Sequence, residues 1–296
     1  MSSLLVVGDA ILDRYLYGVA TRLSPEAPVP VMRVTGQINQ AGGACNVALN
    51  ANALGVTTRL LSIVGQDDAA RELVAALNFQ LSRFQIHQAR IKTTVKTRHI
   101  VGNQHLLRID DEEPCSSSEL SDTLRYLAAY AEDADWIIFS DYGKHFQSRA
   151  QEIIDIARNA GRPIAVDPKS DDWEIYRGAT LITPNTAELE RAGGDARELL
   201  RKYSIKEALV TEGSQGMTHH SARRKASIHR DAIAQDVIDV TGAGDTALAA
   251  FVVGRARGWK TEGCMDFANT AAGMVCGMMG THVASDIPKP KDTIAA

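Results

Sequence analysis

The most constraining feature of the sequence is a series of short apolar runs, each of which stops abruptly at polar or glycine residues. The runs cover residues 4–7, 136–139, 164–166, 180–183 and 208–210. Helical patterns lie between them, at residues 44–54, 118–131, 147–159 and 245–257. Short apolar runs are typical of strands buried on both faces, and their alternation with helices predicts an α/β fold with a mostly parallel sheet.

The polar residues that follow these runs are of one kind, with short oxygen-bearing side chains. They are Asp9, Asp141, Asp167, Asn185 and Thr211. Ligands of parallel sheets bind outside the carboxyl ends of the strands, so we expect these residues to share one face and to form a site. A strand-end Asp or Asn also caps the helix that follows it, and for any single residue this structural role is an equally good interpretation.

Two stretches depart from the alternation. Residues 15–38 and 86–110 are rich in β-branched residues and indicate antiparallel strands. Together they would form a small sheet that covers the strand ends as a lid, although a pair of surface hairpins fits the same pattern. We expect residues 1–296 to form one domain with these lid segments, because α/β domains of this size often share a single core.

The composition limits the class of partner. Charged residues make up 23% of the chain and the net charge is −4, so we expect neither nucleic acid nor a membrane surface as a partner. No signal peptide or membrane-spanning run is present in the sequence, which predicts a cytoplasmic location and a small-molecule ligand. The cysteines lack the paired spacing of a zinc site and are predicted to be reduced thiols. They are Cys45, Cys115, Cys264 and Cys276.

The most informative segment for function is residues 236–251, where a β-like run enters Gly242, Ala243 and Gly244 before an Ala-rich helix. Converging backbone amides at a helix N-terminus are suited to holding phosphate. Asp245 would stand beside this anion hole, where it can accept the proton of an attacking hydroxyl. The pattern therefore favours a kinase, and the helix N-terminus is expected to keep Asp245 ionised.

The same glycines also match other sequence motifs. Gly242, Gly244 and Ala247 match the dinucleotide fingerprint GxGxxA, and Glu262 falls about twenty residues later. That fingerprint normally opens the first βα unit, whereas here it lies late in the chain with no strand before Glu262. No Walker A sequence occurs. Alone, the motif would be a plain helix-opening turn, but a second one, with Gly42, Gly43 and Asn46, opens another helix near Asp9.

Three ordered motifs carry a resemblance to the ribokinase or PfkB family of carbohydrate kinases, over essentially the whole chain. They are AGGACNVALNANALG at 41–55, TPNTAELE at 183–190 and DVTGAGDTALAAF at 239–251. The resemblance implies a ribokinase-like three-layer sandwich with a small β-sheet lid, an ATP-dependent reaction with Mg²⁺, and a homodimer that pairs through the lid.

The resemblance also assigns roles by position. It implies that Asp245 is the base and that Gly242, Ala243 and Gly244 form the anion hole. The sugar-binding residues would be Asp9, Asp13, Gly42, Gly43 and Asn46. The nucleotide-binding residues would be Asn185, Glu188, Thr211, Gly213, Gly216, Asn269 and Gly273. Glu188 would hold Mg²⁺ through water, while Asp239 and Thr241 would bind a monovalent cation such as K⁺.

Within the family the resemblance is most detailed to the D-glycero-β-D-manno-heptose 7-phosphate kinases, through segments such as GDAILDRYLYG at 8–18 and SDYGKH at 140–145. It implies transfer of the ATP γ-phosphate to the anomeric hydroxyl of a heptose 7-phosphate, giving the 1,7-bisphosphate. A bound phosphate needs cations at the far end of the sugar pocket. The candidates are Lys169 first, then Arg98, Lys96, Arg108 and Arg22.

Two departures and two alternatives accompany this assignment. Gly102 stands where these kinases usually have a basic residue, and the stretch at 76–92 is shorter than usual. The sequence ends without a nucleotidyltransferase domain, so kinase activity alone is expected. A kinase for another sugar, sugar phosphate or nucleoside fits the same motifs. A non-catalytic sensor on the same fold is disfavoured, because a sensor does not require Asp245 beside an anion hole.

Overall fold

The computed structural model describes residues 2–78, 80–81, 83–102, 104–113, 118–233, 237–278 and 280–285. Cys115 lies outside the described residues. Cys45, Cys264 and Cys276 are free thiols, the first two of them buried, as predicted.

The main sheet has nine strands in the described part of the chain, in the spatial order β13-β12-β11-β10-β9-β8-β1-β4-β5. In chain order they are β1 (Ser3–Gly8), β4 (Thr57–Val64), β5 (Phe84–Gln88), β8 (Trp136–Ser140), β9 (Ile164–Asp167), β10 (Leu181–Ile182), β11 (Glu207–Thr211), β12 (Met217–Ser221) and β13 (Ile228–Arg230). All neighbours are parallel except β12, which is antiparallel to both β11 and β13. The mostly parallel α/β sheet predicted from the apolar runs is therefore confirmed.

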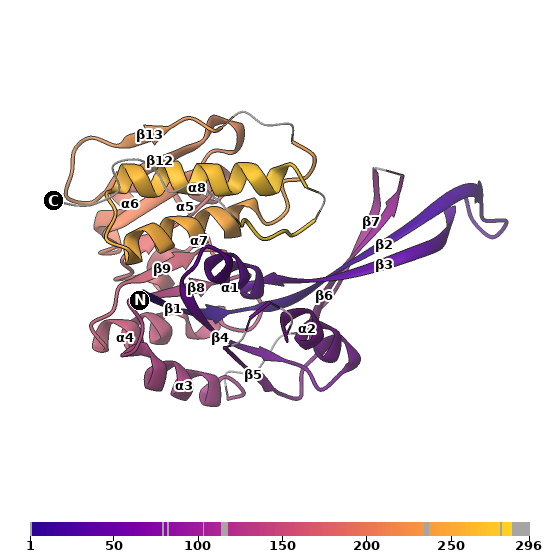
Figure 1. The fold of residues 1–296 in the computed structure, drawn as a ribbon, viewed down its shortest axis with the longest axis horizontal. Coiled ribbons are helices and arrows are strands. Elements are labelled where there is room, and N and C mark those ends of the chain that lie inside the picture. Colours follow the sequence, from indigo (N-terminus) through magenta and orange to yellow (C-terminus); the bar gives the residue numbers. More distant parts are fainter. Residues whose placement is uncertain are drawn as a thin grey trace.

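Helices cover both faces of this sheet (Figure 1). Leu4 and Val6 of β1 join a core with α1 (Ala44–Ala53), α2 (Asp68–Asn78), α7 (Ala243–Ala256) and α8 (Thr261–Cys276). Leu5 and Val7 point the other way, into a second core with α3 (Ser121–Ala131), α4 (Ala150–Asn159), α5 (Thr186–Ala192) and α6 (Ala196–Lys202). Alternate residues of one apolar strand thus pack into two different cores. This explains why the apolar runs of the sequence have no polar face.

A second sheet of four strands projects from the main body as a long arm (Figure 1). Its order is β3 (Pro30–Gly43), β2 (Ala10–Leu23), β6 (Thr94–Val101) and β7 (Gln104–Asp111). We call these four strands the small sheet. The lid segments were predicted at 15–38 and 86–110, but residues 86–88 belong to β5 of the main sheet, where Phe84 and Ile86 pack against the core. β2 and β6 pair in parallel, which a pair of independent hairpins would not do.

Two further boundaries differ from the sequence prediction. The β-like run before the glycine turn is not a strand: Val237, Ile238 and Val240 are each at least 60% exposed, and the backbone is irregular. These apolar residues have no partner strand in the described chain, so their β propensity is not realised. Helix α4 begins at Ala150, after a 3₁₀ turn at Gln147–Arg149 that occupies the predicted first turn.

The chain enters the small sheet twice, and its first excursion, through β2 and β3, leaves and returns to the main body at one point. It leaves β1 at Gly8 and returns where Gly43 of β3 enters α1, and the Ala44 N–H donates to the Asp9 carbonyl at 2.9 Å. Gly43 has φ +60°, and a Cβ there would lie 2.3 Å from the Asp9 carbonyl oxygen. Only glycine fits this crossing, because both the conformation and the close approach exclude a side chain.

Replacing Gly43 by Ala is expected to lower the free energy of unfolding by about 2 kcal/mol or more, since it combines a left-handed conformation with a backbone clash. Urea denaturation measures the change. Gly36→Ala on the same strand is the control, because no atom of the described chain lies within 4 Å of a Cβ built there. Equal stability of the two variants would contradict this account of the crossing.

Candidate active site

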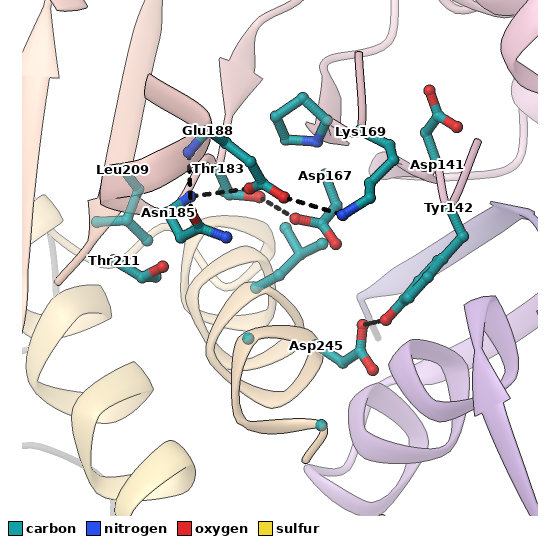
Figure 2. Close-up of a pocket in the computed structure, with 14 residues that line it drawn as sticks. Asp141, Tyr142, Asp167, Lys169, Thr183, Asn185, Glu188, Leu209, Thr211 and Asp245 are labelled. Carbon is teal, nitrogen blue, oxygen red and sulfur yellow. Dashed lines mark hydrogen bonds and ion pairs between the residues drawn. The ribbon is translucent and has the colours of Figure 1, made fainter. Parts of the chain in front are cut away.

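A cavity of about 190 Å³ opens at the carboxyl ends of β8, β9 and β11, beside the first turn of α7 (Figure 2). Nine of its fourteen lining residues are polar, and four of these are acidic. The lining consists of Asp141, Tyr142, Asp167, Pro168, Lys169, Thr183, Asn185, Glu188, Leu209, Thr211, Gly242, Gly244, Asp245 and Leu248. Four of the five strand-end residues are therefore gathered here, together with the predicted base.

Asp245 lies in the first turn of α7 and is only 4% exposed. Asn46 Nδ2 donates to its Oδ2 at 2.9 Å, and the Tyr142 hydroxyl donates to its Oδ1 at 2.7 Å. Burial raises the pKa of Asp245 to about 6, against the opposing effect of these two donors. Desolvation thus opposes the helix N-terminus that was predicted to keep Asp245 ionised, but a pKa of about 6 still leaves the carboxylate mostly ionised at neutral pH.

The glycine turn before Asp245 contributes two of its three residues to the cavity. Gly242 adopts the left-handed conformation at the N-cap of α7, and a Cβ there would lie 2.7 Å from Asn46 Nδ2. Gly242 and Gly244 line the cavity, whereas the N–H of Ala243 donates to the Val240 carbonyl at 3.2 Å. The Ala243 amide is thus already used within the turn, which weakens its predicted place in an anion hole.

Asp9, predicted to bind sugar, has a structural environment. Its side chain is fully buried, and its two oxygens accept hydrogen bonds from four backbone N–H groups of the loop after β8. The donors are Tyr142 at 2.9 Å, Lys144 at 3.2 Å, His145 at 2.8 Å and Phe146 at 3.3 Å. The carboxylate therefore holds that loop in place, and its lone pairs are occupied.

Asp13 and Arg98 form a buried ion pair, with 2.5 Å between Arg98 Nη1 and Asp13 Oδ1. The Arg98 guanidinium also lies 5.1 Å from the centre of the Tyr15 ring. Its charge is thus balanced by Asp13. The sequence-based prediction was that this charge binds the phosphate of the sugar. Gly42 is needed here because a Cβ would lie 1.9 Å from Asp13 Oδ2.

The other basic residues of the small sheet differ in position. Arg108 is exposed on β7 and pairs with Asp110 at 2.9 Å, and Arg22 is exposed on β2. Lys96 is half-buried on β6, and its ammonium lies 5.0 Å from the centre of the Tyr142 ring. Of the small-sheet cations predicted from sequence, Lys96 is thus the one in contact with a residue of the cavity.

Lys169, predicted to bind the sugar phosphate, lies beside Glu188 of the predicted magnesium and nucleotide site. Its ammonium is 3.6 Å from Glu188 Oε1 (Figure 2). Glu188 and Asn185 form a reciprocal capping box at the start of α5: the Glu188 N–H donates to Asn185 Oδ1 at 2.9 Å and the Asn185 N–H donates to Glu188 Oε2 at 3.0 Å. The capping role was the alternative interpretation of Asn185, and it holds while both side chains also line the cavity.

The residues predicted to bind the nucleotide are more widely spread. Thr211 lines the cavity, and Gly213 starts a 3₁₀ turn directly after β11. Asn269 of α8 donates to the Asp231 carbonyl at 3.0 Å, and Gly216 passes close to the Arg230 carbonyl. Gly273 lies one turn after Asn269 on α8. Gly216 and Asn269 thus contact the segment at the end of β13.

Asp239 and Thr241 are in contact, as a shared cation site requires. The Thr241 N–H and hydroxyl donate to Asp239 Oδ1 at 2.9 and 2.7 Å, and the Gly280 N–H donates to Oδ2 at 2.9 Å. Burial raises the pKa of Asp239, but these hydrogen bonds outweigh it and the pKa is lowered. The group therefore carries its negative charge, which fits a monovalent cation but is also explained by the local turn.

Two more carboxylates face the cavity. Burial raises the pKa of Asp141 to about 6, although the Tyr176 hydroxyl donates to it at 2.5 Å. The pKa of Asp167 is raised well above its usual range by burial first and by the nearby Asp245 and Glu188 charges next. So many acidic groups around one cavity favour a ligand that brings cations with it.

A magnesium ion fits only as part of a complex with the nucleotide. Among the described residues, no group of three or more His, Cys, Asp or Glu side chains is placed to hold a metal by itself. Mg²⁺ commonly keeps several waters and binds through one or two carboxylates and substrate phosphates. Glu188, with Asp167 near it, provides that number of ligands.

Residues 1–288 match the pfkB family of carbohydrate kinases. The chain belongs to this family. Solved structures support the same fold: Arabidopsis thaliana ribokinase with ribose and ATP has a TM-score of 0.74 at 22% identity, covering 95% of each chain. Escherichia coli phosphofructokinase-2 in complex with potassium has a TM-score of 0.81 at 18% identity, covering 96% of each chain. The ribokinase-like fold and the membership of the carbohydrate kinase family, both predicted, are thereby confirmed.

Curated relatives are more similar in sequence. The chain is 39% identical to the bifunctional protein HldE of Sodalis glossinidius over 97% of its length, and 40% identical to that of Hahella chejuensis over 96%. It spans 62% of the length of these relatives.

Sequence reasoning missed the role of Tyr142, although this residue follows a strand-end acid within the SDYGKH segment. An aromatic residue in a loop carries no periodic signal, and its hydroxyl reaches Asp245 across about a hundred residues of sequence. The position after Asp141, at the binding edge of the sheet, was the available signal.

The structural role of Asp9 can be tested by Asp9→Asn. The amide replaces one acceptor oxygen with a donor that faces backbone N–H groups, so the free energy of unfolding should fall by about 2 kcal/mol. Urea denaturation measures this. Asp135→Asn is the control, because exposed Asp135 also accepts a backbone hydrogen bond, from Ser3 at 2.8 Å, and should cost less. If Asp9→Asn leaves the stability unchanged and raises the KM for the sugar, Asp9 binds the substrate and the structural role is wrong.

Proposed function

We propose that this carbohydrate kinase transfers the γ-phosphate of ATP to the anomeric hydroxyl of D-glycero-D-manno-heptose 7-phosphate, giving the 1,7-bisphosphate. The observation that carries the chemistry is Asp245, a buried carboxylate held by Asn46 and Tyr142 at the edge of the cavity. The heptose phosphate is supported by the motifs shared with heptose 7-phosphate kinases and by the identity to HldE proteins. A related sugar or sugar phosphate is the alternative.

The reaction needs one proton acceptor and one region of positive potential. A sugar oxygen attacks the γ-phosphorus as the bond to the β-phosphate oxygen breaks, and the hydroxyl proton passes to Asp245. The transition state of phosphoryl transfer is loose, so the proton leaves late and a weak base suffices. With a pKa of about 6, Asp245 is ionised at neutral pH. The first turn of α7 beside it supplies the positive potential.

Lys169 is assigned to the phosphoryl group in transfer. Its ammonium lies between Glu188 and the Asp245 side of the cavity (Figure 2). A lysine there can neutralise charge that develops on the moving phosphoryl group. This differs from the sequence-based assignment to the sugar 7-phosphate, which would place Lys169 far from the nucleotide residues.

The remaining ions are proposed from the same geometry. Glu188 would hold Mg²⁺ through water, and the ion would offset the negative charge of the nucleotide phosphates. Asp239 and Thr241 would hold K⁺ near the glycine turn, and the similar phosphofructokinase-2 has been solved in complex with potassium. Thr211, Gly213, Gly216, Asn269 and Gly273 would surround the nucleotide.

The sugar 7-phosphate is expected to lie towards the small sheet, with Lys96 as its first cation. Lys96 contacts Tyr142, whereas Arg98 is already paired with Asp13. Gly102 begins the turn between β6 and β7 with φ +62°, where a basic side chain is usual in heptose kinases. Recognition of the phosphate thus rests on fewer cations than the family pattern provides.

The small sheet is also the proposed dimer interface. It carries exposed apolar side chains that water would otherwise surround. They include Val19, Val34, Ile38, Leu106, Leu107 and Ile109. Pairing with a second copy through this sheet would cover them and close the sugar site.

Among the described helices, none is both long and apolar enough to span a bilayer. A cytoplasmic location remains our proposal.

Turnover of a panel of sugars and sugar phosphates with MgATP tests the substrate. Heptose 7-phosphate should give the highest kcat/KM, and phosphate should appear on the anomeric oxygen by ³¹P NMR. Asp245→Asn should reduce kcat by about 10³-fold while the Kd for ATP is retained, because only proton acceptance is lost. Phosphorylation of free sugars alone would sink the heptose phosphate assignment, and full activity of Asp245→Asn would sink the base.

Lys169→Met should lower kcat by about 10²-fold with little change in the KM of the sugar phosphate, because the lost charge acts on the phosphoryl group in transfer. Steady-state kinetics with each substrate varied provides the measurement. Exposed Lys206→Met, at the start of β11, is the matched control and should behave as wild type. A selective rise in the KM of the sugar phosphate would instead restore Lys169 to the far end of the sugar pocket.

A further inference from the structure

We infer that Tyr142 is a positioning residue for Asp245, and that it links the base to the small sheet. The inference rests on the proposed role of Asp245 as base. Three observations support it: the hydrogen bond from the Tyr142 hydroxyl to Asp245, the anchoring of the loop that carries Tyr142, and the contact of its ring with Lys96.

The hydrogen bond from Tyr142, together with that from Asn46, fixes the orientation of the Asp245 carboxylate. Asn46 donates to Oδ2 and Tyr142 to Oδ1, so the carboxylate cannot rotate without losing a bond on each side. Each carboxylate oxygen has a second lone pair, and the sugar hydroxyl can use that of Oδ1 beside the tyrosine. Burial and the nearby Asp245 raise the pKa of Tyr142 well above its ordinary value, so its hydroxyl stays a donor across the working pH range.

The loop that carries Tyr142 is fastened at its backbone and at a side chain. Its N–H groups donate to the buried Asp9 carboxylate, including that of Tyr142 itself at 2.9 Å. The ammonium of Lys144, two residues further on, lies 2.6 Å from Glu112, which follows the last strand of the small sheet. A fixed backbone gives the phenol little freedom, so its hydroxyl is delivered to Asp245 at a defined position.

The ring of Tyr142 is in turn reached from the small sheet. The Lys96 ammonium on β6 lies 5.0 Å from the ring centre, within the range of a cation–π contact. A cation near the phenol strengthens its hydroxyl as a donor, and the Lys96 charge also lowers the pKa of Asp245 directly. Lys96 of the small sheet thereby affects the pKa of Asp245 in two ways: through its contact with Tyr142 and through the direct effect of its charge.

The sign of the pH effect follows from the donor. A hydrogen bond to the charged form of Asp245 lowers its pKa, so removing the Tyr142 hydroxyl must raise it. A general base is active when deprotonated, and kcat/KM is lost as the pH falls through that pKa. The acid limb of the pH profile, expected near 6 in the wild type, should therefore move to higher pH in Tyr142→Phe.

The first test measures kcat/KM between pH 5 and 9 for wild type, Tyr142→Phe and the control Tyr130→Phe. The Tyr130 hydroxyl donates to Gln85 at 3.3 Å, on the strand at the far edge of the main sheet. Tyr142→Phe should be about tenfold slower than wild type at pH 6 and much closer to it at pH 8.5. Equal losses at both pH values would mean that Tyr142 only supports packing, and the inference would fail.

The second test needs no turnover. The ¹³C NMR titration of labelled Asp carboxyl groups, with Asp245→Asn for assignment, should give a higher pKa for Asp245 in Tyr142→Phe than in wild type or Tyr130→Phe. An unchanged pKa overturns the inference even if the kinase is active. A raised Asp245 pKa in a protein that phosphorylates no sugar would uphold the effect of Tyr142 on Asp245 and would reject the proposed function.

The link to the small sheet has its own test. Lys96→Met should raise the Asp245 pKa in the wild-type background by more than it does in Tyr142→Phe, because part of its effect passes through the phenol. The same NMR titration of the two single variants and the double variant measures this difference. If the Asp245 pKa shifts of the two single variants simply add up in the double variant, Lys96 acts on Asp245 through its charge alone. The proposed link through Tyr142 would then be wrong.

Discussion

The Asp9 carboxylate, buried at the point where the chain leaves the main sheet for the small sheet, accepts four backbone hydrogen bonds from the loop after β8. That contact ties together β1, the small sheet and the loop that carries Tyr142. Because Gly43 crosses the same point, α1 starts directly beside it and brings Asn46 to Asp245. The geometry of the proposed base thus depends on a buried carboxylate whose oxygens are occupied by backbone N–H groups.

Crowding of carboxylates is the second constraint on the site. Asp141, Asp167 and Asp245 all have raised pKa values because burial disfavours their charged forms. Lys169, paired with Glu188, is the cation placed among them in the cavity lining. A magnesium nucleotide would bring further positive charge to the acidic side of the cavity. The pocket is therefore suited to binding phosphate together with its metal, rather than a bare anion.

Sequence patterns predicted the sheet, the edge at which the cavity lies and the position of Asp245 in its lining, because each rests on local periodicity or on a glycine turn. They could not separate Asp9 from Asp13, which lie four residues apart in the same apolar surroundings. One faces backbone amides and the other faces Arg98, and this difference arises only once β8 and β6 are packed beside them. Tyr142 was missed for the same reason, since its partner is distant in the sequence.

In the proposed mechanism the division between the two sheets separates chemistry from specificity. The proposed base Asp245, the glycine turn and Lys169 belong to the main sheet and its helices, whereas Lys96 and the turn at Gly102 belong to the small sheet. A change such as Gly102 can therefore alter which sugar is held without disturbing phosphoryl transfer. Since Lys96 also contacts Tyr142, the two sheets are not independent: a substrate phosphate that draws Lys96 away from the ring would change the hydrogen bond that tunes Asp245. Recognition of the distant phosphate and activation of the attacking hydroxyl would then be parts of one electrostatic network.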